Sequence, residues 1–181
     1  MKNLSTLIIS AALIASTANA DALSDVIMDE NAGCLSGPVE QFGRYIGNWD
    51  IRDQQLQQDG TWVERPGAKW NFMCVGNGIA VQDFWMPNGG GMGTNLRIHD
   101  PETGNWDIAW TSSGAPGFAH ITAEELDNGN ILMHYVNPLE TPRRITFFPP
   151  TKDAWNWHQE MSFDGGETWT VVYKIEATRV K

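Results

Sequence analysis

The feature that most constrains this chain is the regular spacing of its turn residues. Short clusters of Gly, Asn, Asp and Pro recur along the sequence, and the runs between them alternate apolar and polar residues. One such run places Trp106, Ile108 and Trp110 on the same face. This pattern is typical of antiparallel strands joined by hairpins. The turn clusters lie near residues 58–60, 76–78, 87–93, 100–104, 127–129, 149–153 and 164–166.

These signals predict an all-β fold with about ten strands. No helical pattern of useful length separates the strands, which excludes a parallel α/β sheet. Because a long run of hairpins must curl or close to remove its edges, we expect an antiparallel up-and-down β-barrel, with a β-sandwich as the alternative. Barrels of this size can hold one small ligand. The predicted strands are 45–57, 61–75, 79–86, 93–99, 105–111, 118–125, 130–136, 143–148, 154–163 and 167–179.

The first twenty residues have the pattern of a signal peptide. Lys2 supplies a positive charge, residues 7–15 a short apolar stretch, and Ala18-Asn19-Ala20 a small-x-small cleavage signal. We therefore expect a secreted or periplasmic protein. The predicted organisation is a signal peptide over 1–20, an N-terminal arm over 21–41 and one barrel domain over 42–181.

Charge and hydropathy restrict the partners of the chain. The formal net charge is −10, so nucleic acid and anionic membrane surfaces would repel it. No later segment approaches the run of about eighteen apolar residues that a membrane-spanning helix needs. The sequence thus predicts a small-molecule partner, no nucleic acid and no membrane insertion, and it leaves the oligomeric state open.

The chain has two cysteines, Cys34 and Cys74. In an oxidising compartment they are expected to pair, which would tie the arm to an early strand; two buried free thiols are the alternative. Neither cysteine belongs to a CxxC motif, so redox catalysis and a cysteine-based zinc site are both disfavoured.

Both ends of the predicted barrel carry a known pattern. Gly47-Asn48-Trp49 opens the first strand and Arg179 closes the last. This resembles the calycin pattern of the lipocalins, in which an early Gly-x-Trp packs beneath a late Arg at the closed end. The resemblance implies that Trp49 and Arg179 close this barrel, with a guanidinium stacked on an indole face.

A longer part of the chain resembles the bacterial lipocalin-like domains of unknown function of the DUF1579 type. The matching stretches are Gly78–Trp85, Gly93–Trp110 and Ser162–Trp169, and with both ends they span most of residues 42–179. The resemblance implies a barrel with a cavity and brings no settled activity. Ser162–Trp169 also matches the Asp-box hairpin of sialidase-like propellers, but a propeller needs several such repeats, so we interpret this one as a structural hairpin.

The tryptophans point most directly to function. The chain has nine, more than a small barrel needs to fill itself, and indoles offer flat faces to aromatic or lipid-like ligands. For any single tryptophan, core filling is the simpler explanation. As cavity walls we predict Trp70, Trp85, Trp110 and Trp157.

Two residues are predicted to supply polar anchors, Arg97 and Tyr135. If Arg97 points inward, its guanidinium can bind the carboxylate of an anionic ligand. Alternatively, Arg97 forms an ion pair with Asp83 on the neighbouring strand, and the two interpretations are compatible. An exported barrel that sequesters or carries a partly apolar or aromatic ligand is therefore the favoured function.

An enzyme of the same shape is the alternative. It would use a histidine–carboxylate pair for acid–base chemistry, either His120 with Asp83 or His158 with Glu160. His158 and Glu160 are two residues apart and so share a sheet face, although Trp155 and Trp157 claim the opposite one. A third possibility is an interaction protein whose tryptophans dock a partner.

No cofactor or metal is predicted. HExxH, GxSxG, Walker and EF-hand motifs are absent from the sequence. Haem remains a hypothesis, because the related nitrobindin barrels bind it through a single histidine. His158 and His134 are its candidate ligands, since both lie in aromatic strands.

Overall fold

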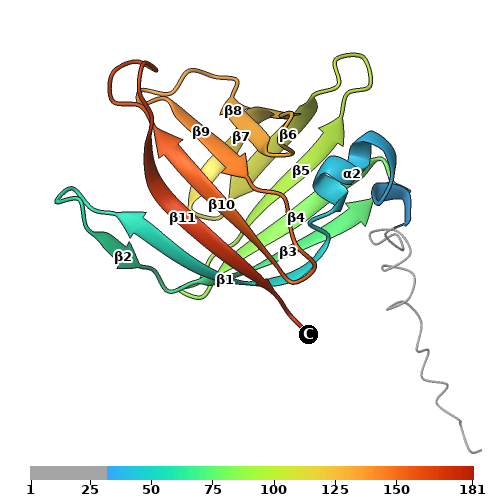
Figure 1. The fold of residues 1–181 in the computed structure, drawn as a ribbon, viewed down its shortest axis with the longest axis horizontal. Helices are drawn as coiled ribbons and strands as arrows, with labels where there is room; N and C mark the ends of the chain where they lie inside the picture. Colours follow the sequence, from blue (N-terminus) through green and yellow to red (C-terminus); the bar gives the residue numbers. More distant parts are fainter. Residues whose placement is uncertain (1–31) are drawn as a thin grey trace, which may run out of the picture.

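The computed structural model describes residues 32–181, and their strands form one closed antiparallel sheet (Figure 1). The predicted signal peptide and residues 21–31 of the predicted arm lie outside the described residues. In chain order the elements are η1 (Ala32–Cys34), η2 (Gly37–Val39), α2 (Glu40–Gly43), β1 (Gly47–Leu56), β2 (Trp62–Glu64), β3 (Ala68–Val75), β4 (Ala80–Pro87), β5 (Gly93–His99), β6 (Trp106–Ser112), β7 (Ala115–Glu125), β8 (Ile131–Tyr135), β9 (Arg143–Phe147), β10 (Ala154–Met161) and β11 (Thr170–Arg179).

The strands follow one another around the barrel in chain order. From β3 to β11 each strand pairs with the next, β3 also pairs with β1, and β11 returns to β1 to close the ring. The additional strand β2 pairs with the far half of β1 and projects from the barrel (Figure 1). The prediction of an up-and-down barrel is thus confirmed with ten strands in the ring, and the β-sandwich alternative is excluded.

One predicted strand is divided in two. Residues 61–75 were expected to be continuous, but they form β2 and β3, separated by Arg65-Pro66-Gly67. Gly67 has a φ of +78°, and a Cβ there would lie 2.6 Å from the carbonyl oxygen of Ile51. Because proline cannot donate to a ladder and this glycine conformation disfavours other residues, the chain must bend here.

The segment from η1 to Tyr45 closes one end of the barrel. Phe42 and Tyr45 are fully buried and pack against Phe147 at ring distances of 5.6 and 5.3 Å. Figure 1 shows α2 at this end. The predicted boundary between arm and barrel, at residue 42, therefore falls inside a single plug that belongs to the core.

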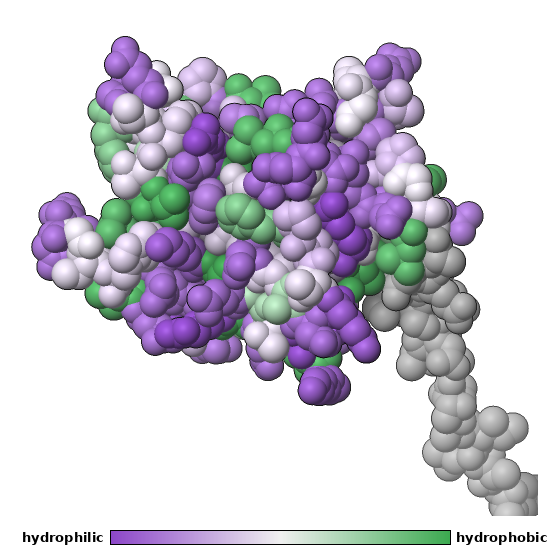
Figure 2. Space-filling view, viewed as in Figure 1, coloured by the Kyte–Doolittle hydropathy of each residue, from purple (hydrophilic) through white to green (hydrophobic). Residues whose placement is uncertain are grey.

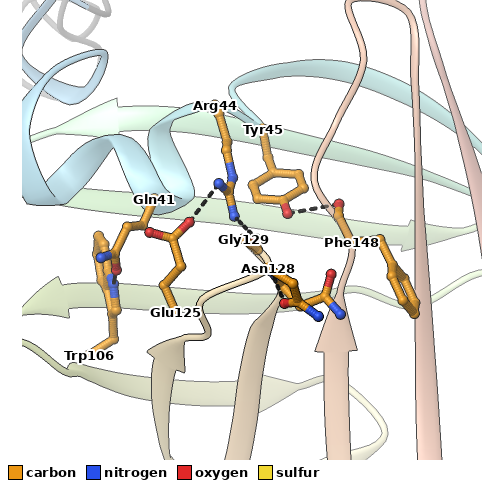
Figure 3. Close-up of polar contacts among 9 residues, drawn as sticks. Gln41, Arg44, Tyr45, Trp106, Glu125, Asn128, Gly129 and Phe148 are labelled. Atoms are coloured by element: carbon orange, nitrogen blue, oxygen red, sulfur yellow. Dashed lines mark hydrogen bonds and ion pairs between the residues drawn. The ribbon is translucent and has the colours of Figure 1, made fainter.

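Hydrogen bonds fix the plug to the turns around it (Figure 3). Arg44 donates to Glu125 Oε1 and to the carbonyl oxygen of Gly129, both at 2.6 Å. The Tyr45 hydroxyl donates to the carbonyl oxygen of Phe148 at 2.9 Å, and Trp106 Nε1 donates to Gln41 at 2.7 Å. The plug is thus attached to three separate parts of the barrel.

The closing strands meet as the calycin resemblance implies. Trp49 lies opposite Arg179 in the β1–β11 register, and the Arg179 guanidinium lies 4.0 Å from the centre of an indole ring of Trp49. Arg179 also donates to the carbonyl oxygens of Ile46 and Lys152. Gly47 leaves the room for this side chain, since a Cβ there would lie 2.2 Å from Arg179 Nη1. Trp49 and Arg179 therefore join the first and last strands, at a seam between β1 and β11, and also close this end of the barrel.

A disulfide bond joins Cys34 in the plug to Cys74 in β3. The bond closes a loop with a sequence separation of 40 residues. Replacing both cysteines by serine is expected to lower the free energy of unfolding by about 3–4 kcal/mol, because the unfolded chain regains the entropy of that loop. Urea denaturation of both proteins measures the difference. A double variant as stable as the unmodified protein would show that the plug is held without the bond.

The Ser162–Trp169 hairpin forms as a structural unit. Asp164 accepts hydrogen bonds from the Thr168 side chain, the Thr168 amide and the Ser162 hydroxyl. These bonds lower the pKa of Asp164 from 3.8 to about 2. Trp169 packs outside the barrel, 4.4 Å from the Arg144 guanidinium.

The lowered pKa of Asp164 predicts a pH-dependent contribution to stability. A carboxyl whose pKa is depressed by folding stabilises the protein above its unfolded pKa and loses that effect as the pH falls toward the folded value. The stability difference between the unmodified protein and Asp164→Asn should therefore be full above about pH 5 and shrink toward about pH 2. Urea midpoints across this range test the expectation, and a constant difference would contradict it.

Candidate ligand cavity

A cavity of about 280 Å³ lies inside the barrel, beyond the aromatic core that surrounds the plug. All six residues predicted as walls or anchors line it: Trp70, Trp85, Arg97, Trp110, Tyr135 and Trp157. The other lining residues are Asn95, Ile121, Met133, Ile145, Phe147, Gln159, Tyr173 and Ile175. Since they come from nine of the ten strands of the ring, β3 to β11, nearly the whole barrel shapes the site.

Strand alternation and register bring the aromatic walls together. Trp70 faces Trp85 across the β3–β4 pair, and their rings meet edge to face at 5.0 Å. Trp157 on β10 approaches Trp70 from across the β11 and β1 strands, at a ring distance of 6.4 Å. The Trp110 ring lies over Gly93, where a Cβ would come within 2.1 Å of it. A glycine is therefore needed beneath this wall.

The polar end of the cavity is built on Arg97. Its side chain is fully buried, as is that of Asp83, and Nη2 lies 2.5 Å from Asp83 Oδ2. The guanidinium carbon also lies 4.7 Å from the Phe42 ring centre and 5.2 Å from that of Phe72. Arg97 thus faces inward as an anchor would, and it also forms the predicted ion pair.

Asp83 is held in place by a neighbouring asparagine. Its carboxylate accepts hydrogen bonds from the Asn95 amide at 3.1 Å and from Asn95 Nδ2 at 3.0 and 3.2 Å. A buried charge pair is tolerated when such further bonds satisfy its lone pairs. The network fixes the position of the Asp83 carboxylate beside Arg97.

A second buried polar pair, Asp53 and Tyr173, was not predicted. Tyr173 lines the cavity on the side away from the plug, and its hydroxyl donates to the Asp53 carboxylate, which also accepts from the Gly67 amide at 2.9 Å. Burial, and then the hydrogen bond to Asp53, raise the pKa of Tyr173 well above its usual value. Asp53 alternates with Trp49 and Ile51 on β1, which was a signal that it faces inward.

A second hollow adjoins the cavity. It measures about 600 Å³ and shares Gln159 and Tyr173 with the inner cavity. The β1–β2 hairpin lines one side, through Gln55, Leu56, Gln57, Gln58 and Gly60, and Phe163 and Arg143 lie on another. The shared residues place this hollow next to the inner cavity, at the end of the barrel that carries the β1–β2 hairpin.

The two candidate catalytic pairs do not form in the cavity. His120 bonds to Asp107 at 2.9 Å on the outer surface, whereas Asp83 is buried inside, so these two residues lie on opposite faces of the sheet. His158 and Glu160 are also outside, because Trp155 and Trp157 occupy the inner face of β10. Glu160 is held there by Arg144, with bonds of 2.7 and 3.1 Å.

The histidines proposed for haem also face away from the cavity. His134 is exposed on β8, next to the inward-facing Met133 and Tyr135. Burial lowers the pKa of His158, whose ring packs edge to face on Phe148 at 4.9 Å. No histidine of residues 32–181 lines the cavity, so the site does not fit a histidine-ligated haem.

The described residues offer no cluster of three or more histidine, cysteine or acidic side chains that could hold a metal ion. Within the same residues, no helix has the length and apolar character needed to cross a membrane.

Comparison with known proteins identifies the fold but no family. No protein-family model and no curated protein matches the chain. The S-type phycobiliprotein lyase CPES from Guillardia theta is similar in structure, with a TM-score of 0.53 and 12% sequence identity over 84% of this chain and 97% of that one. Rv2717c from M. tuberculosis has a TM-score of 0.51 and 11% identity over 81% of this chain and 99% of its own. These likenesses show the fold alone, a closed antiparallel β-barrel.

Proposed function

We propose that this protein is an exported binding protein that sequesters or carries a small, partly apolar or aromatic molecule inside its barrel. The observation that carries the proposal is the cavity itself, in which four indoles surround a space that ends on a buried arginine. Its volume, about 280 Å³, is close to the lower end of the range for small-molecule sites, roughly 300 Å³ and above. A flat molecule of a few fused rings suits such walls.

The distribution of the tryptophans favours binding inside the barrel over docking of a protein partner. Trp49, Trp70, Trp106 and Trp155 are buried, and three more line the cavity. The remaining two, Trp62 and Trp169, lie outside and are each covered by a cation. The face in Figure 2 is mainly hydrophilic, with apolar side chains in small scattered groups.

Export is proposed from the signal-peptide pattern of the first twenty residues. The Cys34–Cys74 disulfide supports it, because such bonds persist in oxidising compartments. The resemblance to DUF1579 domains agrees with a cavity-containing barrel. The neighbouring lyase shares the fold alone, so the proposal depends on this chain's own cavity.

Binding can be tested with N-phenylnaphthylamine, an uncharged aromatic probe that fluoresces when it leaves water. We expect saturable binding to the protein and about tenfold weaker binding to Trp157→Ala, because one wall of the cavity is lost. Fluorescence titration measures both affinities.

Trp62→Ala provides the matched control. Trp62 lies outside the barrel beside Lys174, 3.9 Å from its amine, and does not line the cavity. This variant should bind the probe like the unmodified protein. Equal weakening in both variants, or no saturable binding at all, would contradict the proposal.

A further inference from the structure

The cavity has an excess of hydrogen-bond donors. In residues 32–181, the buried side-chain atoms of the cavity wall that lack a hydrogen-bond partner are Trp70 Nε1 and the guanidinium nitrogens of Arg97. Of the Arg97 nitrogens, Nη2 forms the ion pair with Asp83, whereas Nε and Nη1 have neither a hydrogen bond nor an ion pair. Since a buried donor without a partner is costly, a bound molecule would gain by bringing an acceptor oxygen to this end.

The charge of Arg97 is already balanced, however. Asp83 is as deeply buried as Arg97, and its carboxylate is fixed by Asn95, so it cannot turn away when a ligand arrives. A second buried carboxylate, Asp53, lies beside Tyr173 at the far end of the cavity. An anionic ligand would therefore bring another negative group beside a guanidinium that Asp83 already pairs, in a chain with a net charge of −10.

We propose that the ligand carries an uncharged acceptor, a carbonyl oxygen of the ketone, quinone or ester type, which it seats on Arg97, and that Asp83 is the residue that excludes carboxylates. This inference rests on the proposed binding function and names its ligand class. It replaces the sequence-based expectation that Arg97 anchors an anion. The free edge of the guanidinium supplies the hydrogen bond, and the aromatic walls hold the rest of the molecule.

Three probes that share one aromatic ring system test the proposal: naphthalene, methyl naphthyl ketone and naphthoate, of which the last two are of equal size. Each is titrated against N-phenylnaphthylamine bound to the full protein. We expect the ketone to bind at least about tenfold more tightly than naphthalene, because it satisfies a charged donor, and naphthoate to bind more weakly than the ketone by a similar factor.

Asp83→Asn is the diagnostic variant. The substitution keeps the shape of the side chain and removes its charge, which leaves Arg97 unbalanced. Naphthoate should then gain at least about tenfold relative to the ketone. If the variant does not fold, the order of the three probes in the unmodified protein decides alone.

The outcomes separate this inference from the function on which it rests. If naphthalene and the ketone both fail to displace the bound probe, the proposed cavity function fails. If naphthalene binds but the ketone is no tighter, or naphthoate is the tightest of the three, the cavity function stands and the assignment of the ligand class is overturned. An Asp83→Asn variant with an unchanged order would overturn the role of Asp83.

Discussion

Replacing Arg97 by methionine is expected to lower the free energy of unfolding by about 3–5 kcal/mol, because the substitution leaves the Asp83 carboxylate buried without its counter-charge. Both side chains are fully buried, so water cannot take over from the lost partner. Urea denaturation at neutral pH measures the loss.

A double variant separates charge pairing from packing. Arg97→Met combined with Asp83→Leu removes both charges and keeps most of the buried volume, so we expect it to recover at least half of the loss. The orphaned Asn95 amide prevents a full recovery, since it donates to Asp83. A single variant that loses less than about 1 kcal/mol would contradict the expectation that Arg97 stabilises the buried Asp83 carboxylate.

Replacing Trp49 by alanine is expected to cost about 3–5 kcal/mol, in the range for large aromatic side chains in cores. Trp49 is fully buried, and its Nε1 donates to the carbonyl oxygen of Tyr45 at 2.7 Å. The Arg179 guanidinium also stacks on its indole where β1 meets β11. The variant therefore loses packing, a bond to the plug and the contact that joins the first and last strands of the barrel.

Trp62→Ala is again the control, because Trp62 is the same residue type outside the barrel. Its loss should change the free energy of unfolding by about 1 kcal/mol or less. Comparison of the two urea transitions tests the closure role. Equal costs in Trp49→Ala and Trp62→Ala would show that the seam does not depend on the buried indole.

The sequence predicted the barrel well because its information is local. Hairpin turns need Gly, Asn and Asp at particular positions, and half-buried strands need alternation, so both patterns are visible without any tertiary contact. Pro66-Gly67 is a local break signal of the same kind, and it separates β2 from β3 inside the predicted strand 61–75. The plug was not predicted, because its short turns carry no periodic pattern. It is stabilised by packing against aromatic residues that are distant in the sequence.

The cavity walls were predictable for the same reason, since alternation assigns each tryptophan to a face. The polar contacts in and around the cavity were harder to predict from the sequence. Asp53 and Tyr173 are 120 residues apart and meet only because the barrel closes. The predicted catalytic pair of His120 and Asp83 requires both side chains on the same face of the sheet. The strand register places them on opposite faces. The balance of charge around Arg97 likewise appears only once burial is known.

The β1–β11 seam has a consequence for the nascent chain. Every other pairing in the ring joins strands that are neighbours in the sequence, or, for β1 and β3, that are separated only by β2. By contrast, β11, which pairs with the other edge of β1, is synthesised only after more than a hundred further residues. Throughout that interval β1 is a bare edge that another chain could join. Its outward-facing Asp50 and Arg52 are charged and exposed, and charges on an edge discourage such pairing. We therefore expect these two side chains to protect the unfinished protein, whatever they contribute once the ring has closed.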